Sequence, residues 1–228
     1  FEEGKALVDP GAFSRVVEIP SGKRERTVRT GEEWFFRTSA QVPGKVFDAK
    51  RDFGAKGDGS TDDTVAIQQT IDAAREHGRN AIAYLPFGAY RVDKTIEVTG
   101  SDYTVGSTGF GSKLVWNGPE NGVMIAVRNP NEVTIEHLMM EGPDNVTRIR
   151  QTGDRSNSSI SYNNLHLPSV YSDAPGLELM RLPAGAIVRT GLVAGYLHAV
   201  DSGQATLLAR IRIGRTVVEG AELPKTGF

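Results

Sequence analysis

Cysteine is absent from the 228-residue sequence, which excludes both a disulfide framework and a thiolate metal site. Histidine is scarce and scattered, and no two histidines stand at the spacing of metal ligands. We therefore predict no metal centre, and we expect each histidine to lie on the surface or in a ladder of stacked residues. The four are His77, His137, His166 and His198.

Strong charge of one sign and long apolar runs are also missing. The formal net charge is -2 and the pI is about 6.1, so the chain lacks the basic field by which many proteins bind nucleic acid. No apolar run approaches the ~20 residues that a membrane-spanning helix needs. We expect neither a nucleic-acid partner nor a membrane span.

Residues 1–45 differ in composition and pattern from the rest of the chain. They mix charges with one aromatic cluster, WFF, which begins at Trp34, and Pro43-Gly44 marks a joint after it. Alternating polarity in the stretches VVEI and RTVRT predicts two short strands. The cluster either anchors this segment on the body or stacks on sugar rings. We divide the chain into a leader, residues 1–45, and a body, residues 46–228.

The stretch from Val46 to Tyr90 organises the body. The turn GAKGDGS, which begins at Gly54, supplies three glycines where we expect positive φ. The cluster STDD that follows offers N-cap residues, apolar residues then recur at helical spacing, and Gly78 stands where a helix ends. The pattern predicts one amphipathic helix over about residues 62–77.

The aspartates of this stretch have a structural interpretation. A calcium loop of the EF-hand type needs ligands at alternate positions over about twelve residues, and that pattern is absent. The turn also lacks the GK[ST] ending of a phosphate-binding loop. We expect Asp58, Asp62 and Asp63 to cap the helix and complement its dipole.

The order DFGAKGDGSTDDTVAIQQTIDAA followed by AIAYLPFGAYRV resembles the N-terminal cap of the pectate lyase superfamily of right-handed parallel β-helices. That superfamily includes pectate lyase-like and polygalacturonase-like enzymes, fungal-type exo-glucanases and phage tailspikes. The resemblance implies that the helix plugs the open end of a solenoid. It also implies a secreted or cell-surface protein that acts on polysaccharide, without selecting one reaction.

Strand-like runs dominate the rest of the chain. From Val123 on, short runs recur at about twenty residues per coil, each cut by Asn, Gly, Asp or Pro, and Asn131, Asn163 and Asn164 fall at turns. Inward Val, Ile and Leu of successive coils can then stack into one core. We predict an all-β fold, a right-handed parallel β-helix (solenoid) with an N-terminal capping α-helix. A sandwich or jelly roll is the competing fold.

Three features depart from the superfamily. No superfamily motif appears beyond about residue 142, and the chain stops after about six coils. The proline-rich segment 167–185 predicts a loop insertion or an irregular coil. The chain begins with Phe1 and ends without a capping helix. It is therefore processed or truncated, or its open end is covered by loops or by another chain in an oligomer, because an uncovered end aggregates.

Candidate site residues are sought on the outside of the sheets. A lyase of this fold removes the proton beside a uronate carboxylate, with calcium to neutralise charge, whereas a hydrolase needs carboxylates about 5 to 9.5 Å apart. A charged cluster begins at Asp144, and its other interpretation is an ordinary solvated strand and turn. The catalytic candidates are Asp144, Arg150 and Asp154, and the substrate-binding candidates are Glu136 and Arg148.

The sequence leaves the function open between two classes. The first is a carbohydrate-active enzyme, a polysaccharide lyase or glycoside hydrolase, with calcium as a cofactor in the lyase case. The second is a non-catalytic binding or structural module of the tailspike type. The polygalacturonase aspartate and Gly-His pattern and the pectate lyase calcium and arginine motifs are absent, so no catalytic residue is carried over from the superfamily.

Overall fold

The computed structural model describes residues 5–8, 15–18, 45–107, 109, 111–167, 172–202, 205–213 and 216–219. It divides the chain into two units, Phe1–Val42 and Pro43–Phe228. In the first unit, β1 (Lys5–Val8) and β2 (Arg15–Glu18) form an antiparallel pair. β2 covers part of the predicted strand VVEI. The predicted strand RTVRT and the aromatic cluster at Trp34 lie outside the described residues.

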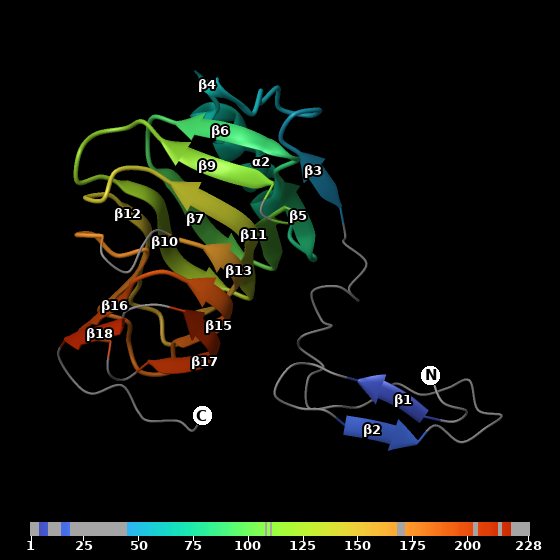
Figure 1. Cartoon of the computed structure of the whole chain (residues 1–228), viewed down its shortest axis with the longest axis vertical. Coiled ribbons are helices and arrows are strands. Elements are labelled where there is room, and N and C mark those ends of the chain that lie inside the picture. Colours follow the sequence, from blue (N-terminus) through green and yellow to red (C-terminus); the bar gives the residue numbers. More distant parts are fainter. Residues whose placement is uncertain are drawn as a thin grey trace. The chain divides into compact units, whose positions relative to one another are not determined.

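The second unit consists mainly of parallel strands, and successive strands of the chain are added along two sheets (Figure 1). Its first strands are β3 (Val46–Asp48), β4 (Asp58–Asp62), β5 (Ala81–Tyr84), β6 (Gly88–Val92), β7 (Ile96–Ser101), β8 (Tyr103–Gly106), β9 (Ser112–Trp116) and β10 (Val123–Asn131). The later strands are β11 (Val133–Glu141), β12 (Thr147–Thr152), β13 (Ser159–His166), β14 (Leu177–Met180), β15 (Ile187–Ala194), β16 (Leu197–Val200), β17 (Thr206–Ile213) and β18 (Thr216–Glu219).

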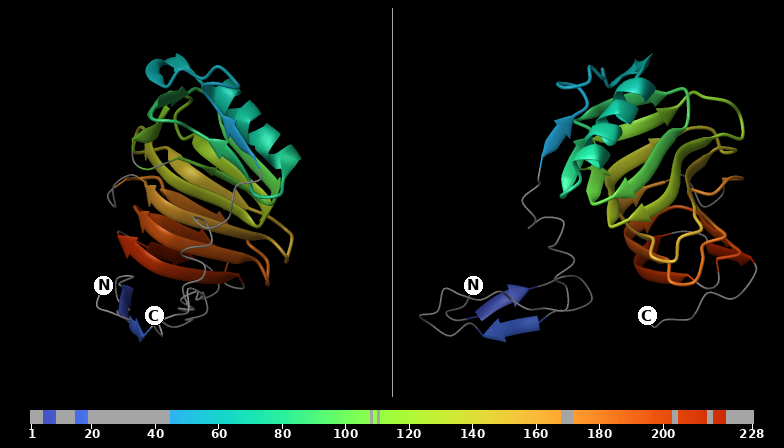
Figure 2. Two further views of the ribbon diagram at one scale, coloured as in Figure 1. Left: turned by 90° about the vertical axis from the view of Figure 1, so that its right-hand side faces the viewer. Right: turned by 180° about the vertical axis from the view of Figure 1, so that it is seen from behind.

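Strand order shows how the chain winds. One sheet has six strands in the order β18-β16-β14-β12-β10-β7, and a ten-stranded sheet runs β17-β15-β13-β11-β8-β5-β3, with β4, β6 and β9 joined to it through β11. Successive passes of the chain thus add one strand to each sheet, always parallel to the previous one. The arrangement is mostly β and β-helix-like, as predicted. The two views of Figure 2 show the same stack from its side and from behind.

The core is a column of apolar side chains from strands in register. In the six-stranded sheet, Ile96 pairs with Ile125, Ile125 with Ile149, Ile149 with Leu177, and Leu177 with Leu197. All five are buried. Each such side chain contributes about 1.5 to 3 kcal/mol to the free energy of unfolding, so pairing in register is what makes the stack stable.

The single helix of the described residues, α2 (Thr64–His77), lies against the first strands, including β5 and β7 (Figure 2). It begins two residues later than predicted and buries Ile67, Ile71 and Ala74. Gly78 ends it with φ of 58°. The glycines of the preceding turn also adopt positive φ, as predicted, at Gly54, Gly57 and Gly59.

The aspartates before α2 are structural, but they do not all cap it. Asp63 occupies the N-cap position without capping the helix by its side chain. Its buried carboxylate instead accepts hydrogen bonds from the backbone N–H groups of Lys56 and Gly57, at 2.7 and 2.8 Å. Asp63 therefore fastens the Gly-rich turn to the start of the helix, because it satisfies the turn's own backbone donors.

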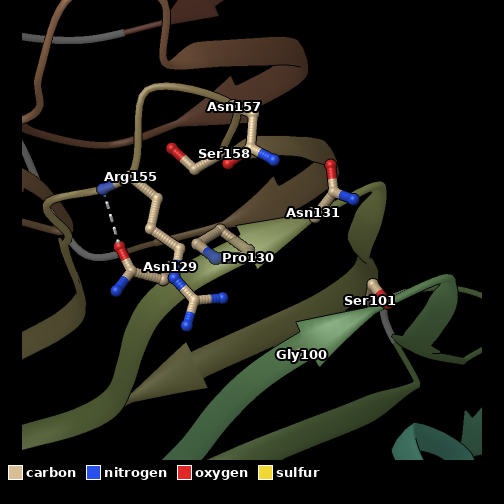
Figure 3. A pocket seen from close by; sticks show the side chains of 8 residues that line it. All are labelled: Gly100, Ser101, Asn129, Pro130, Asn131, Arg155, Asn157 and Ser158. Carbon is tan, nitrogen blue, oxygen red and sulfur yellow. Dashed lines mark hydrogen bonds between the residues drawn. The ribbon is translucent and has the colours of Figure 1, made fainter.

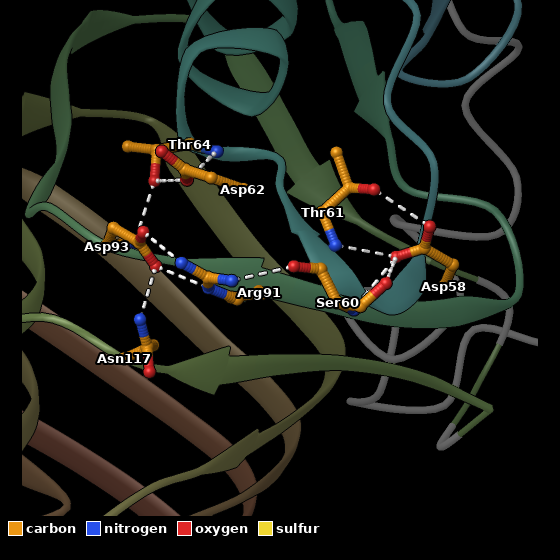
Figure 4. A network of polar contacts seen from close by, with 8 residues as sticks. All are labelled: Asp58, Ser60, Thr61, Asp62, Thr64, Arg91, Asp93 and Asn117. Carbon is orange, nitrogen blue, oxygen red and sulfur yellow. Dashed lines mark hydrogen bonds and ion pairs between the residues drawn. The ribbon is translucent and has the colours of Figure 1, made fainter.

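A network of polar contacts surrounds this start (Figure 4). Asp58 accepts from the backbone N–H groups of Ser60 and Thr61, both at 2.8 Å. Arg91 forms an ion pair with Asp93 at 2.6 Å, and the Thr64 hydroxyl accepts from the Asp93 N–H at 2.9 Å. Arg91 also donates to the Ser60 carbonyl at 2.7 Å, so that these contacts join β4, α2 and β6.

Two further expectations meet the structure. Segment 167–185, predicted as a loop or irregular coil, contains the regular strand β14, with Leu177 and Leu179 buried between prolines that flank the strand. The described residues on either side of β14 lie in irregular backbone, bends and turns, so the prediction fails only within this short strand. The asparagines predicted at turns lie within strands instead, Asn131 as the last residue of β10 and both Asn163 and Asn164 in β13, where Asn164 has a positive φ of 48°.

Replacement of Asp63 by alanine removes two charge-assisted hydrogen bonds from the Gly-rich turn. We expect Asp63→Ala to lower the free energy of unfolding by about 3 kcal/mol. Denaturant unfolding followed by circular dichroism measures the change. Asp58→Ala, at an exposed carboxylate in the same network, is the control and should cost less. Equal losses in the two variants would contradict the role assigned to Asp63.

Candidate functional site

The charged cluster predicted around β12 is divided by the strand itself. Asp144 lies in the turn before β12, and Asp154 lies in the loop after it. A six-residue strand spans about 20 Å, whereas two carboxylates that cooperate in hydrolysis lie about 5 to 9.5 Å apart. Asp144 and Asp154 therefore do not form a catalytic pair with each other.

Both aspartates have local partners. Asp144 Oδ1 accepts a hydrogen bond from the Ser172 hydroxyl at 3.2 Å. Asp154 Oδ1 accepts from Asn129 Nδ2 at 2.8 Å. These contacts tie neighbouring passes of the chain together, and a catalytic role for either aspartate stays a prediction.

Arg148 does not face outward, and that expectation is wrong. Its side chain is fully buried, and burial lowers the pKa of its guanidinium while Asp144 acts against the shift. The guanidinium folds back under the turn before β12 and satisfies backbone carbonyls that would otherwise be unpaired. The accepting carbonyls are those of Gly142, Pro143 and Val146.

Arg150 does face outward, and it begins a row of charged side chains across the six-stranded sheet. Parallel pairing places it beside Glu178 of β14, and Glu178 beside His198 of β16. The residues directly before Arg150, Glu178 and His198 in the sequence point into the core. Because side chains alternate along a strand, these three side chains point away from the core. We call the four residues Arg150, Glu178, His198 and Glu219 the charged row.

Distances within the charged row make it one connected unit. Arg150 Nε donates to Glu178 Oε2 at 2.5 Å. His198 Nδ1 lies 3.9 Å from Glu178 Oε1, and His198 Nε2 lies 3.3 Å from Glu219 Oε1. The ring of Tyr196 stacks on the imidazole, with 5.9 Å between ring centroids. One imidazole is thus held between two carboxylates.

Exposure changes along the charged row. The side chains of Glu178 and His198 are 11% and 16% exposed, while those of Arg150 and Glu219 are 37% and 62% exposed. The central pair is therefore largely removed from water, where charge interactions are strong, and both ends of the row are accessible to a ligand.

Sequence reasoning found only one end of this row. Glu178 lies in the segment predicted to be irregular, and His198 was expected only as a surface or ladder residue. Arg150 and Glu178 are 28 residues apart, so nothing local in the sequence joins them. The coil spacing of about twenty residues was the one available signal.

Glu136, a predicted substrate-binding residue, lies in the ten-stranded sheet and not in the charged row. It pairs with Asn163 and neighbours His137, whose Nε2 is 4.0 Å from Glu136 Oε2. Burial raises the pKa of the Glu136 carboxyl, while His137 and a hydrogen bond from Asn163 act against the shift. The structure thus separates Glu136 from Arg150.

The charged row combines a group that can transfer a proton, the imidazole, with a cation, the guanidinium. An imidazole can act as a general acid or base in catalysis, and an exposed guanidinium suits a carboxylate ligand. Among the described residues, no group of three or more His, Cys, Asp or Glu side chains is arranged to hold a metal ion. Within the same ranges, no helix is long and apolar enough to cross a membrane.

Loss of Arg148 should act on stability. We expect Arg148→Ala to lower the free energy of unfolding by about 3 kcal/mol, because several buried carbonyls lose their donor. Arg128→Ala, at an exposed arginine of β10, should change it by less than about 0.5 kcal/mol. Urea unfolding of both variants makes the comparison, and a stable Arg148→Ala protein would overturn the structural role.

Glu136 should make stability depend on pH. Its folded-state pKa is raised, so protonation favours the folded state, and that stability is present at low pH and lost as pH rises through the folded-state pKa. We expect Glu136→Gln to raise the melting temperature at pH 7 and to leave it nearly unchanged near pH 4. Thermal melts across this range test the expectation. A gain that is equal at both values would refute it.

Comparison with known families gives a match at the start of the second unit. Residues 47–105 match the family described as "Rhamnogalacturonase A/epimerase, pectate lyase-like". The matched region runs from β3 to β8 and includes the Gly-rich turn and α2.

Curated relatives align over less than half of the chain. Alginate lyase 7 of Azotobacter vinelandii is 46% identical over 72 residues, which cover 28% of this chain and 8% of the relative. A probable glucan endo-1,3-beta-glucosidase of Arthroderma benhamiae is 45% identical over 109 residues, which cover 40% of this chain and 12% of the relative. The aligned region is thus a small part of each relative.

A solved structure extends the likeness of fold. ORF18 of Geobacillus virus E2 superposes with a TM-score of 0.51 at 15% identity, over 95% of this chain and 47% of that chain. This agreement concerns the fold alone. The family match at residues 47–105 supports a likeness to the pectate lyase-like superfamily, and the stack of parallel strands is consistent with a β-helix-like fold.

Proposed function

We propose that this chain is part of a polysaccharide-acting enzyme that removes the proton beside the carboxylate of a uronate residue. The observation that carries the proposal is the charged row, which places a cation, a carboxylate and an imidazole on adjacent strands in register. The curated relative named alginate lyase supports the substrate class, and the matched family name includes an epimerase. Lyases and epimerases of uronates share this proton removal.

Each member of the charged row has a role in this chemistry. His198 is the base, because its imidazole is the general acid–base group at the centre of the charged row. Glu178, whose Oε1 lies 3.9 Å from His198 Nδ1, stabilises by its charge the imidazolium that forms. Arg150 gives one donor to Glu178 and retains others, since a guanidinium has five, for the uronate carboxylate on which negative charge develops.

Access to the base requires a small movement. His198 Nε2 is buried beneath Glu219, whose side chain is largely exposed and sits at the end of β18. Rotation of this side chain uncovers the nitrogen for a substrate. Calcium, where it takes part, would add to the neutralisation of the uronate carboxylate.

The proposal also covers the fold, the location and the assembly of the enzyme. We place the charged row on a right-handed parallel β-helix whose first end is closed by α2. The polysaccharide substrate makes a secreted or cell-surface location the natural one, and the end of the stack at β17 and β18 is the surface through which an oligomer would form. Neither nucleic acid nor a membrane span has a part in this function.

Hydrolysis is the second candidate reaction. Its supporting observation is that two carboxylates, those of Glu178 and Glu219, flank one imidazole, because glycosidases use a pair of carboxylates. The curated relative named as a glucosidase accords with this alternative. Hydrolysis creates reducing ends without an unsaturated uronate, so products separate the two reactions.

The test is a screen of alginate, polygalacturonate, rhamnogalacturonan and β-1,3-glucan, with and without calcium. A lyase yields absorbance at about 235 nm from unsaturated uronate ends, and a hydrolase yields new reducing ends alone. An epimerase changes only the proton NMR spectrum of the uronate residues. We expect His198→Ala to lower turnover by about 10² to 10⁴-fold without loss of folding.

His166→Ala is the matched control, because His166 is exposed near the end of β13 and lies outside the charged row. Its turnover should equal that of the unmodified chain. No product with any substrate from the folded protein would sink the enzyme proposal and favour the non-catalytic binding module. Full activity of His198→Ala would sink the assignment of the base.

A further inference from the structure

A pocket lies at the carboxyl ends of β7 and β10, beside the loop that follows β12 (Figure 3). Its volume is about 140 Å³, close to that of a cavity that accepts one six-membered ring. The polar part of its wall consists of Ser101, Asn129, Asn131, Arg155, Asn157 and Ser158. None of these residues belongs to the charged row.

The wall of the pocket is fixed by hydrogen bonds. Asn129 Oδ1 accepts from the backbone N–H groups of Asp154 and Arg155, at 2.9 and 3.3 Å, and its Nδ2 donates to Asp154 Oδ1. The backbone N–H of Ser158 donates to the carbonyl of Arg155 at 3.2 Å. The loop after β12 is therefore held against β10 before any ligand arrives, which lowers the entropy cost of binding.

One charge distinguishes the wall. Arg155 is the single ionisable residue among those that line the pocket. Figure 3 shows its guanidinium extended over Asn129 and Pro130. Within the part of the chain that the structure describes, no carboxylate forms an ion pair with it. The nearby Asp154 carboxylate is engaged by the Asn129 amide instead.

The remaining polar groups suit hydroxyl groups. Side-chain amides and hydroxyls can each donate and accept hydrogen bonds, and a sugar ring presents hydroxyls around its edge. Ser158 is 3% exposed, and its hydroxyl oxygen lacks a hydrogen-bond partner among the described residues. A guanidinium beside neutral amides and hydroxyls is the chemistry that recognises a sugar carrying one carboxylate.

We propose that this pocket is a subsite that binds one uronate residue of the polysaccharide, with the carboxylate on Arg155 and the ring hydroxyls on the asparagines and serines. The subsite deepens the proposed function and rests on it. Arg155 follows Arg150 by five residues, so the pocket and the charged row are at most about 17 Å apart along the chain. One short oligosaccharide can therefore reach both.

Calorimetric titration with mannuronate and galacturonate hexasaccharides tests the subsite. Laminari-hexaose, a neutral β-1,3-glucan, provides the uncharged comparison. We expect Arg155→Gln to weaken uronate binding by about 10- to 100-fold, the value of one charge-assisted contact. Arg79→Gln removes one exposed arginine in the turn after α2 and should leave binding unchanged. In an active protein, Arg155→Gln should raise KM and leave kcat nearly unchanged.

The outcomes separate the subsite from the enzyme proposal. Uronate binding that falls in Arg155→Gln supports the subsite even where the unmodified chain forms no product, and only the enzyme proposal then fails. Equal uronate affinity in Arg155→Gln and the unmodified chain overturns the subsite, whatever the activity. Absence of uronate binding by the unmodified chain, or tighter binding of the neutral laminari-hexaose, overturns the subsite as well.

Discussion

Parallel pairing of strands in register is the constraint on which the rest of this structure depends. It stacks Ile125, Ile149 and Leu177 into one buried column, and the same register sets Arg150 beside Glu178 on the opposite side of the strands. A shift of one residue in a strand would exchange the two faces. The buried core and the charged row are therefore both set by the same register of the strands.

The start of the stack is fixed by a different device. The Gly-rich turn needs backbone conformations that side chains disfavour, as the φ of 60° at Gly57 shows. The buried Asp63 carboxylate satisfies the backbone donors of this turn and thereby sets where α2 begins. The first strands then have a covered surface on which to pair, and each later pass of the chain adds to the one before.

Local signals in the sequence predicted the elements well, and long-range contacts poorly. Glycines at positive φ, the helix ending at Gly78 and the recurring strands are properties of short stretches, so one sequence suffices to predict them. Arg148 shares the outward parity of Arg150, yet it turns inward because the neighbouring turn leaves carbonyls unpaired. Glu178 and His198 lie beside Arg150 only because of the strand register across several passes of the chain. That register depends on the conformation of the connecting loops, which the sequence alone does not reveal.

The charged row is better explained by function than by stability. Glu178 and His198 are largely removed from water, and the desolvation of such groups offsets most of what their pairing contributes. Apolar residues at these positions would pack as well as the valines and isoleucines elsewhere in the stack, at no cost in desolvation. The Asp63 carboxylate differs, because it accepts hydrogen bonds from backbone N–H groups of the Gly-rich turn that would otherwise be unpaired. A desolvated acid and imidazole on the outer face, next to a guanidinium that water still reaches, form the arrangement that the proposed proton transfer requires.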